Sequence, residues 1–245
     1  MQALILAGGK GTRLRPYTAV IPKPLMPVGD LPILEIILRQ LKRAGVIEVI
    51  LAVGYMGQMF QAFFGDGARL GLKISYSFEE RALGTAGPIA LALDRLEDNF
   101  LVMNGDLLTT LDYGRLFAAH CRSGAAATIG MCRREVRIDF GVIKADADGR
   151  LTDYIEKPLY QFDVSMGVNA LNVGAVRKYL TAGVHLDIPD LMMKMKNDGL
   201  AVHCFNEPCY WLDIGRMDDY QTANEIFESR KAEFLPEPAA QPGRP

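Results

Sequence analysis

The sequence lacks the features of several common protein classes. No apolar run approaches the roughly 18 residues of a membrane span. The net charge is only −2, which argues against a protein that binds nucleic acids or membrane surfaces. The N-terminal residues enter an apolar strand directly, without the basic and apolar regions of an export signal. We therefore expect a cytoplasmic protein that has neither nucleic acid nor membrane as a partner.

Cysteine and histidine are also scarce, with four and three residues respectively. The cysteines show no Cys-x-x-Cys spacing, so we expect reduced thiols. His203, Cys204 and Cys209 lie close together in the sequence, but their spacing matches no usual zinc pattern. No histidine falls in the motifs described below, so chemistry based on cations and carboxylates is favoured over a catalytic histidine or cysteine.

The chain does contain a glycine-rich loop directly after its first predicted strand, residues 4–7. Gly8, Gly9 and Gly11 make a turn in which the backbone can approach a ligand closely. The residues that add a hydroxyl group and positive charge beside this turn are Thr12, Arg13, Arg15 and Lys23. Unpaired backbone N–H groups together with fixed cations are what a triphosphate requires.

Two commoner phosphate-binding loops do not fit this segment. No Gly-Lys-Ser/Thr sequence closes the loop at the spacing of a Walker A motif. The third glycine of a dinucleotide fingerprint is missing, which disfavours a dinucleotide oxidoreductase. A plain strand-to-helix turn with surface cations is the non-functional alternative for the loop taken alone.

Alternating apolar strands and helices predict an α/β fold for the first part of the chain. Strands are expected at residues 4–7, 46–53, 72–77 and 99–104, and helices at residues 33–44, 58–64 and 85–96. This order implies a parallel sheet with helices on both faces. Ligands of such sheets bind outside the carboxyl ends of the strands.

The second part of the chain has a different pattern. Short β-rich segments are expected at residues 125–132, 140–145, 151–156 and 166–173, as a mixed or antiparallel extension that carries the acceptor pocket. A helix at 188–196 that Asp187 could cap, a strand at 200–205 and a helix at 216–231 follow. We expect a single domain over residues 1–232 and a disordered tail over residues 233–245, which can bury little surface.

Two aspartates far apart in the chain are candidate Mg²⁺ ligands. Asp106 follows the strand at 99–104, and Asp213 lies in a Trp-Leu-Asp-Ile-Gly segment. Mg²⁺ takes few protein carboxylates and fills its other positions with phosphate oxygens. Either residue alone could be an ordinary turn or helix-end aspartate. Two carboxylates on one metal, however, suit nucleotidyl transfer.

Two further motifs suit contacts with a nucleoside and a sugar. Gly84 and Thr85 lie in a Leu-Gly-Thr-Ala-Gly turn, and Glu156 and Lys157 precede Pro158 at the end of a predicted strand. Lys157 could meet a sugar phosphate, while Glu156 could accept hydrogen bonds from sugar hydroxyls. Taken alone, the Leu-Gly-Thr-Ala-Gly turn could also be a helix start whose small residues serve packing. The Glu156–Lys157 pair could also be an ordinary pair of surface charges.

In their order along residues 1–228, these motifs resemble those of the sugar-1-phosphate nucleotidyltransferases, in particular the mannose- and heptose-1-phosphate guanylyltransferases. The ordered set is GGxGTRLxPxT with PKP, then LGTAG, NGD, FGVI, EKP, Asn-Ala and WLDIG. The resemblance implies a Rossmann-like three-layer α/β sandwich with a mixed, mostly parallel central sheet and a β-rich acceptor-binding part. This agrees with the strand and helix pattern.

The resemblance also implies roles for individual residues. The nucleotide would be bound by Leu6, Ala7, Gly8, Gly9, Gly11, Thr12, Gly84 and Thr85. The catalytic cations would be Arg13 on the β- and γ-phosphates, Lys23 on the α-phosphate and Lys157 on the sugar phosphate. The sugar 1-phosphate would be received by Asn104, Gly141, Glu156, Lys157 and Asn169. Mg²⁺ would be held by Asp106 and Asp213.

The base, the sugar and the oligomeric state are less well defined. LGTAG resembles guanylyltransferases more than thymidylyltransferases, which favours GTP with a mannose- or heptose-type 1-phosphate. A uridylyl- or thymidylyltransferase acting on a glucose-type 1-phosphate is an alternative, and so is a non-catalytic regulatory homologue that binds a sugar nucleotide. The sequence leaves the oligomeric state open, a homo-oligomer included.

Overall fold

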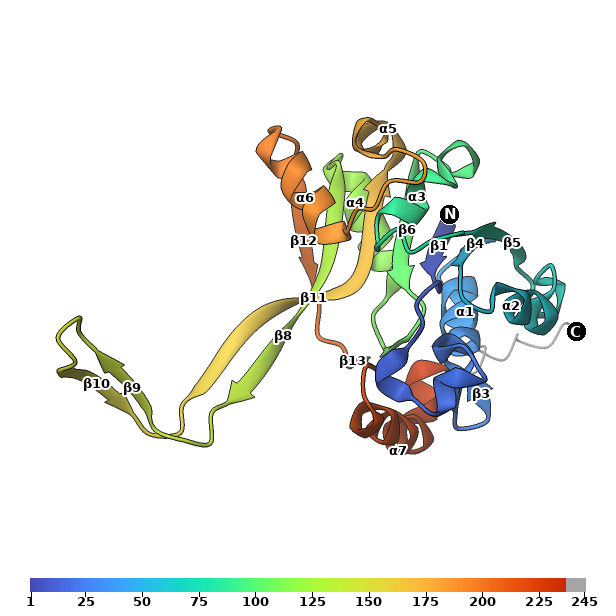
Figure 1. Ribbon diagram of the computed structural model, residues 1–245. Helices are drawn as coiled ribbons and strands as arrows, with labels where there is room; N and C mark the ends of the chain where they lie inside the picture. The colour runs from blue at the N-terminus through green and yellow to red at the C-terminus, as the bar shows by residue number, and fades with distance from the viewer. Residues whose placement is uncertain (237–245) are drawn as a thin grey trace, which may run out of the picture.

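A computed structural model describes residues 1–236 and centres on a seven-stranded mixed sheet (Figure 1). The strand order is β12-β8-β11-β6-β1-β4-β5. These strands span β1 Gln2–Leu6, β4 Glu48–Val53, β5 Lys73–Phe78, β6 Asn99–Asn104, β8 Ala127–Arg137, β11 Leu159–Asn172 and β12 Val202–Asn206. β11 pairs antiparallel with β6 and β8, whereas the other pairs are parallel. The predicted mixed, mostly parallel sheet is thus confirmed.

The central strands are apolar on both faces, and successive side chains enter different cores. In β1, Ala3 and Ile5 belong to one buried cluster and Leu4 to the other. This period of two is what a pleated strand dictates. The first core is closed by α1 Ile33–Arg43, α2 Gly57–Phe64, α4 Tyr113–Ser123 and α7 Met217–Phe234. The second core is closed by α3 Gly87–Ala90, α5 Val173–Val176 and α6 Ile188–Asn197. The predicted three-layer sandwich is therefore confirmed.

Short elements complete the body of the molecule. β2 Pro27–Val28 pairs with β3 Leu31–Pro32, and β7 Leu107–Thr109 pairs with β13 Trp211–Asp213. Single turns of 3₁₀ helix span Thr12–Leu14, Tyr17–Ala19, Lys23–Leu25, Ala68–Leu70, Leu93–Arg95 and Arg177–Tyr179. Over the described residues, every helix is too short or too polar to cross a bilayer.

A carboxylate is buried under α1 in this body. Glu35 of α1 is only 2% exposed. Its carboxylate accepts hydrogen bonds from Arg39 at 2.7 Å and from Arg69 at 2.8 Å. Burial opposes its ionisation, but these hydrogen bonds outweigh that effect, so the pKa of Glu35 lies below its usual value.

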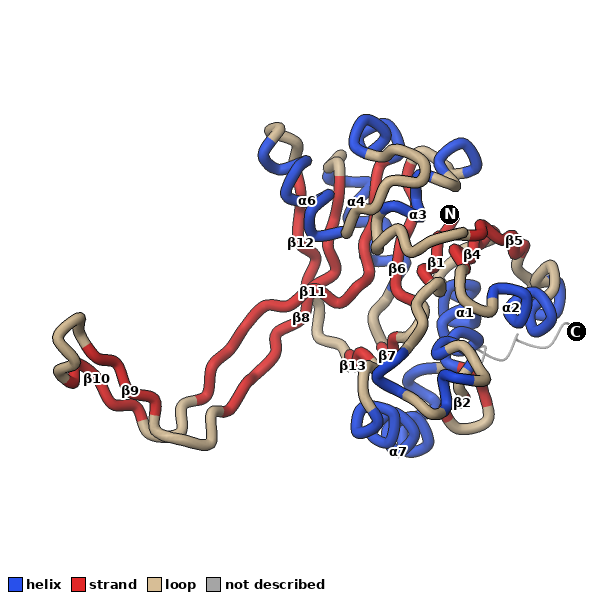
Figure 2. Tube along the Cα trace, viewed as in Figure 1, coloured by secondary structure: helices blue, strands red, loops and turns tan. Residues whose placement is uncertain are grey.

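A long two-stranded arm projects from the sheet. β8 and β11 run on beyond their neighbours and lead into the hairpin of β9 Val142–Ala145 and β10 Leu151–Ile155 (Figures 1 and 2). The sequence predicted strands only at 125–132 and 166–173, so it missed the extended part of both strands. In β8 the reason is chemical, because residues 133–137 include four charged side chains, which hide the usual strand signal. In β11 the signal was present but overlooked, because residues 160–165 alternate apolar and polar side chains.

The helix predicted at residues 85–96 is wrong. Only Gly87–Ala90 is α-helical, and a 3₁₀ turn follows at Leu93–Arg95. The N–H groups of Ala86 and Gly87 both donate to the carbonyl oxygen of Leu186, at 2.8 and 3.0 Å. Tertiary pairing with the 186–188 segment thus replaces a longer helix.

The closing helix extends further than predicted. α7 reaches Phe234 rather than residue 231, and Phe234 is buried against Phe227 and Tyr210. Residues 233 and 234, expected in the tail, therefore belong to the packed helix. The rest of the expected tail, from residue 237 onward, lies outside the described residues.

Candidate active site

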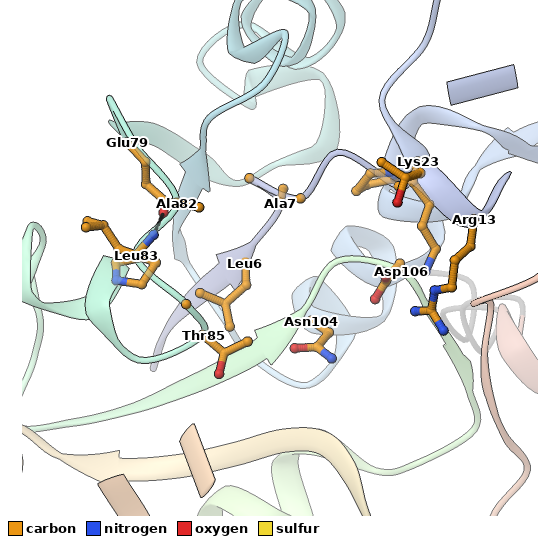
Figure 3. A pocket seen from close by; sticks show the side chains of 17 residues that line it. Leu6, Ala7, Arg13, Lys23, Glu79, Ala82, Leu83, Thr85, Asn104 and Asp106 are labelled. Carbon is orange, nitrogen blue, oxygen red and sulfur yellow. Dashed lines mark hydrogen bonds and ion pairs between the residues drawn. The ribbon is translucent and has the colours of Figure 1, made fainter. Parts of the chain in front are cut away.

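A pocket of about 420 Å³ lies at the carboxyl ends of the parallel strands (Figure 3). We call it the first pocket. Every residue predicted to bind a nucleotide lines it, namely Leu6, Ala7, Gly8, Gly9, Gly11, Thr12, Gly84 and Thr85. Arg13, Lys23, Asn104 and Asp106 line it as well. The structure thus brings together residues that are up to 100 positions apart in the sequence.

The glycine loop has a backbone that side chains would disturb. Gly11 has a positive φ of 58°, and its carbonyl oxygen accepts a hydrogen bond from the Thr18 hydroxyl at 2.8 Å. A Cβ atom on Gly8 would stand 2.4 Å from a carboxylate oxygen of Glu79. Glycine at Gly11 therefore allows the left-handed backbone, and glycine at Gly8 leaves room for the Glu79 carboxylate beside the loop.

The opposite wall is held by hydrogen bonds to the start of α6. Gly84 has a φ of 77°, and a Cβ atom there would lie 2.5 Å from the Leu186 carbonyl oxygen. Asp187 accepts hydrogen bonds from the Thr85 N–H and hydroxyl groups, at 2.9 and 3.2 Å. Asp187 occupies the N-cap position of α6 but does not cap it, so the predicted capping is wrong. The Thr85 oxygen instead accepts from the N–H of Ile188 at 2.8 Å.

Lys23 lies between the two predicted metal ligands. Its ammonium group is 2.5 Å from Asp106 and 3.8 Å from Asp213, and the residue is only 7% exposed. The β7–β13 pairing brings the aspartates together, because Leu107 lies opposite Asp213 in the ladder. Burial and the nearby Asp106 carboxylate raise the pKa of Asp213, against the opposing effect of Lys23 and Arg13.

The aspartates suit a divalent cation. The Oδ1 atom of Asp106 is buried and has no hydrogen-bond partner, while Asp213 stays half-exposed. Within residues 1–236, no group of three or more His, Cys, Asp or Glu side chains is placed to hold a metal. A site with two protein carboxylates is what Mg²⁺ accepts when phosphate oxygens complete its shell.

A second pocket, of about 260 Å³, adjoins the first. Leu6, Thr85 and Asn104 line both pockets. Asn169 and Asp213 also line the second pocket, and Asn169 is buried with an Oδ1 atom that lacks a hydrogen-bond partner. An unpaired buried acceptor is costly unless a ligand satisfies it, and a sugar hydroxyl could do so.

Three predicted sugar-site residues lie elsewhere. Gly141, Glu156 and Lys157 sit on the arm and line neither pocket. Gly141 packs under the Tyr154 ring, where a Cβ atom would come within 2.5 Å. Lys157 has a positive φ of 45°, uncommon for a residue with a side chain. The arm carries them away from the body of their own chain (Figure 1), so their role in binding a sugar phosphate stays a prediction.

The sequence did not point to Glu79, which lines the first pocket at the end away from Asp106 (Figure 3). Glu79 and Leu83 stand at one end, and Arg13, Lys23 and Asp106 stand at the other (Figure 3). Burial raises the pKa of Glu79, partly offset by a hydrogen bond from the Leu83 N–H at 3.2 Å. Glu79 follows β5 as Asp106 follows β6, but the charged neighbours Glu80 and Arg81 gave it the appearance of a surface residue.

Comparisons with known proteins identify the family of the chain. Residues 2–230 match the family model described as Nucleotidyl transferase. The chain is 35% identical to the zebrafish (Danio rerio) mannose-1-phosphate guanylyltransferase catalytic subunit beta, over 97% of this chain and 67% of that protein. It is 33% identical to a UTP–glucose-1-phosphate uridylyltransferase of Synechocystis, over 94% of this chain and 64% of that protein. The chain thus spans slightly less than two thirds of the latter's length.

The fold resembles solved structures over nearly the whole chain. A putative glucose-1-phosphate thymidylyltransferase from Bacillus anthracis, solved with sucrose, superposes with a TM-score of 0.75 at 22% identity. The alignment covers 98% of both chains. At this identity the likeness concerns the fold.

Proposed function

Because the chain belongs to the nucleotidyl transferase family, we propose that it transfers the nucleotidyl group of a nucleoside triphosphate, with GTP favoured, to a sugar 1-phosphate. The products are a nucleotide sugar and pyrophosphate. The observation that carries the proposal is the pair of adjoining pockets, one bearing Arg13, Lys23 and Asp106 at its end and the other bearing Asn169. A triphosphate fits the first pocket and a sugar phosphate fits the second.

The polarity of the first pocket orients the nucleotide. Its polyphosphate lies toward Arg13 and Lys23, and its base toward Glu79 and Leu83 (Figure 3). The ribose then crosses the floor formed by Leu6 and the glycine loop. This places the α-phosphate beside Asn104 and Asp106, at the boundary with the second pocket.

The reaction requires positive groups that stabilise the charge on the phosphates, and it does not require a general base. An oxygen of the sugar phosphate attacks the α-phosphorus in line, and the bond to the bridging oxygen of pyrophosphate breaks. The attacking oxygen is already anionic, so no proton has to be removed. Arg13 and Lys23 offset the repulsion between the two anions and stabilise the charge that develops on the leaving group. Asp106 and Asp213 would hold Mg²⁺, which when bound supplies further positive charge to the phosphate oxygens.

Glu79 supports GTP as the donor. Guanine presents two adjacent donors, N1–H and the N2 amino group, to which one carboxylate can accept in parallel. Uracil and thymine present a single N3–H between two carbonyl oxygens, which a carboxylate would repel. A half-buried carboxylate at the base end thus favours guanine. For the acceptor we favour a mannose- or heptose-type 1-phosphate; the guanylyltransferase relative is named for mannose 1-phosphate.

A pyrophosphate-release assay with Mg²⁺ tests the proposal. GTP, UTP, dTTP, CTP and ATP are each combined with mannose, glucose, heptose and N-acetylglucosamine 1-phosphates. We expect release with GTP above all. Release with UTP or dTTP on glucose 1-phosphate would retain the chemistry and refute the base assignment, in line with the uridylyltransferase relative. No release from any pair, together with nucleotide-dependent melting, would point to a regulatory homologue.

A further inference from the structure

The arm has one apolar and one polar face. Residues directly opposite in an antiparallel ladder project to the same side. Tyr160 lies opposite Val136, Phe162 opposite Arg134, and Val164 opposite Cys132. Five of these six residues, all but the exposed Arg134, form what we call the apolar face, on which the Tyr160 and Phe162 rings lie 6.3 Å apart.

The other side of the ribbon is polar. Arg133 lies opposite Asp163 and pairs with it at 3.3 Å, and Gln161 lies opposite Glu135 and donates to it at 2.9 Å. An isolated two-stranded ribbon is only marginally stable in water, and an apolar face calls for a cover.

The chain leaves this apolar surface uncovered. Phe162 is 53% exposed, and at the tip Phe140, Ile143, Leu151 and Tyr154 are between 57% and 77% exposed. Ile143 and Tyr154 are cross-strand partners, so the tip hairpin also has an apolar side. Apolar groups gathered in this way on one projecting element are typical of an interaction surface.

Within the described residues, no cation lines the second pocket, although the Arg134 guanidinium lies 6.0 Å from the ring of its lining residue Trp211. Among its lining residues, which all belong to the described part of the chain, Asp213 is the charged side chain and no Lys or Arg is present. An anionic sugar phosphate in that pocket needs positive charge beyond what Arg13 and Lys23 provide from the first pocket. Lys157 could supply it, but its own arm points away from the body (Figure 1).

The two strands of the arm pair without interruption. Seven consecutive pairs, from Leu159 opposite Arg137 to Ser165 opposite Met131, join its two strands without a register shift. At about 3.3 Å per residue, this ribbon is roughly 20 Å long. It starts beside the second pocket, which Ser165, Met166 and Gly167 line.

We propose that two copies of this chain exchange arms, so that the apolar face packs on the partner copy and Lys157 completes the partner's second pocket. The inference rests on the proposed function for the role of Lys157. A second copy is the occupant that fits, because the arm carries the cation that the second pocket of an identical chain lacks. Reciprocal exchange about a twofold axis covers both arms and completes both sites.

Complementation between two inactive variants tests the exchange. Lys157→Ala and Asp106→Asn chains are co-expressed with different tags, and the mixed dimer is isolated on both tags in turn. In this dimer, the Lys157→Ala chain keeps its own first pocket and receives an intact Lys157 from its partner. We expect about half of the wild-type pyrophosphate release per dimer, with each parental homodimer nearly inactive. A mixed dimer as inactive as its parents would overturn the exchange, because each arm would then serve its own site.

Sedimentation separates this proposal from the proposed function. The wild type should sediment as a dimer, and Phe162→Ser with Tyr154→Ser should sediment as a monomer with an unchanged circular dichroism spectrum. Gln161→Ser, on the polar side of the same strand, is the matched control and should stay dimeric. A monomeric wild type would overturn the exchange whatever the activity. A dimer that dissociates as expected but releases no pyrophosphate would retain the interface and refute the function.

Discussion

Lys23 is the counter-ion of the two carboxylates at the site, and its replacement by methionine tests this directly. Lys23→Met keeps the length and apolar stem of the side chain and removes the charge. Asp106 and Asp213 would then face each other with Arg13 as the remaining nearby cation. The variant isolates the charge because the lysine stem is already buried.

The structure sets the size of the expected effect. Breaking a fully buried ion pair costs about 3–5 kcal/mol. The side chains of Asp106 and Asp213 are 24% and 45% exposed, so water compensates in part. We therefore expect a loss of about 1–3 kcal/mol in the free energy of unfolding. For a chain of this size, that lowers Tm by roughly 2–10 °C. Turnover should fall by about 10² to 10³, as for the loss of one group that stabilises developing charge.

The assay combines thermal melting with pyrophosphate release. Without the lysine, the carboxylates should bind a divalent cation more tightly, so Mg²⁺ should raise the Tm of Lys23→Met more than that of the wild type. Lys10→Met, an exposed lysine in the same loop, is the control and should change neither property. A variant that melts and responds to Mg²⁺ like the wild type would refute the counter-ion reasoning. Normal turnover with a lowered Tm would leave Lys23 a purely structural role.

Three further predictions follow from buried polar groups. Glu79→Gln should raise KM for GTP by about 10- to 100-fold, as for the loss of a charged hydrogen bond, and should leave KM for UTP nearly unchanged. Glu80→Gln is the control in the same steady-state kinetics. An equal effect from that control would contradict the assignment of Glu79 to the base. Asn169→Ala should raise KM for the sugar phosphate by about tenfold without affecting KM for GTP, and a defect confined to GTP would show that Asn169 is misplaced. Glu35→Gln should destabilise the fold by about 1–3 kcal/mol at pH 7. The folded pKa of Glu35 lies below the unfolded value of about 4.3. Its contribution is therefore present above pH ~4.3 and lost as the pH falls through the folded pKa. Urea unfolding of wild type and Glu35→Gln at pH 7 and pH 3 measures this, and a constant difference between them would refute it.

The parts of the fold that depend on local pattern could be predicted from the sequence. Residues 99–104 alternate between two cores, so their apolar run marks a central strand, and the aspartate that follows must lie at the carboxyl edge of the sheet. The glycine loop was identified for the same reason, because strand, turn and cations are contiguous.

The features that depend on distant pairing were harder to predict. The three-residue strands β7 and β13 carry no periodic signal, yet their ladder sets the distance between Asp106 and Asp213. Helix formation at 85–96 gave way to hydrogen bonds with Leu186. The β8 half of the arm was hidden because the charged residues 133–137 do not have the composition of a strand, whereas the alternation in residues 160–165 could have indicated its β11 half. No pattern in the sequence could indicate that Glu156 and Lys157 would lie outside both pockets of the chain that carries them.

Trp211 gives the protein a built-in optical probe. It is the single tryptophan of the chain, and it lines the second pocket. Its indole N–H donates to the Met166 carbonyl oxygen at the base of the arm at 2.9 Å, and the Arg134 guanidinium lies 6.0 Å from its ring. Tryptophan emission of the whole molecule therefore arises at one point, between the second pocket and the arm. Changes in its intensity or wavelength can report on ligand entry into the second pocket and on displacement of the arm in real time, without a label or a coupled enzyme.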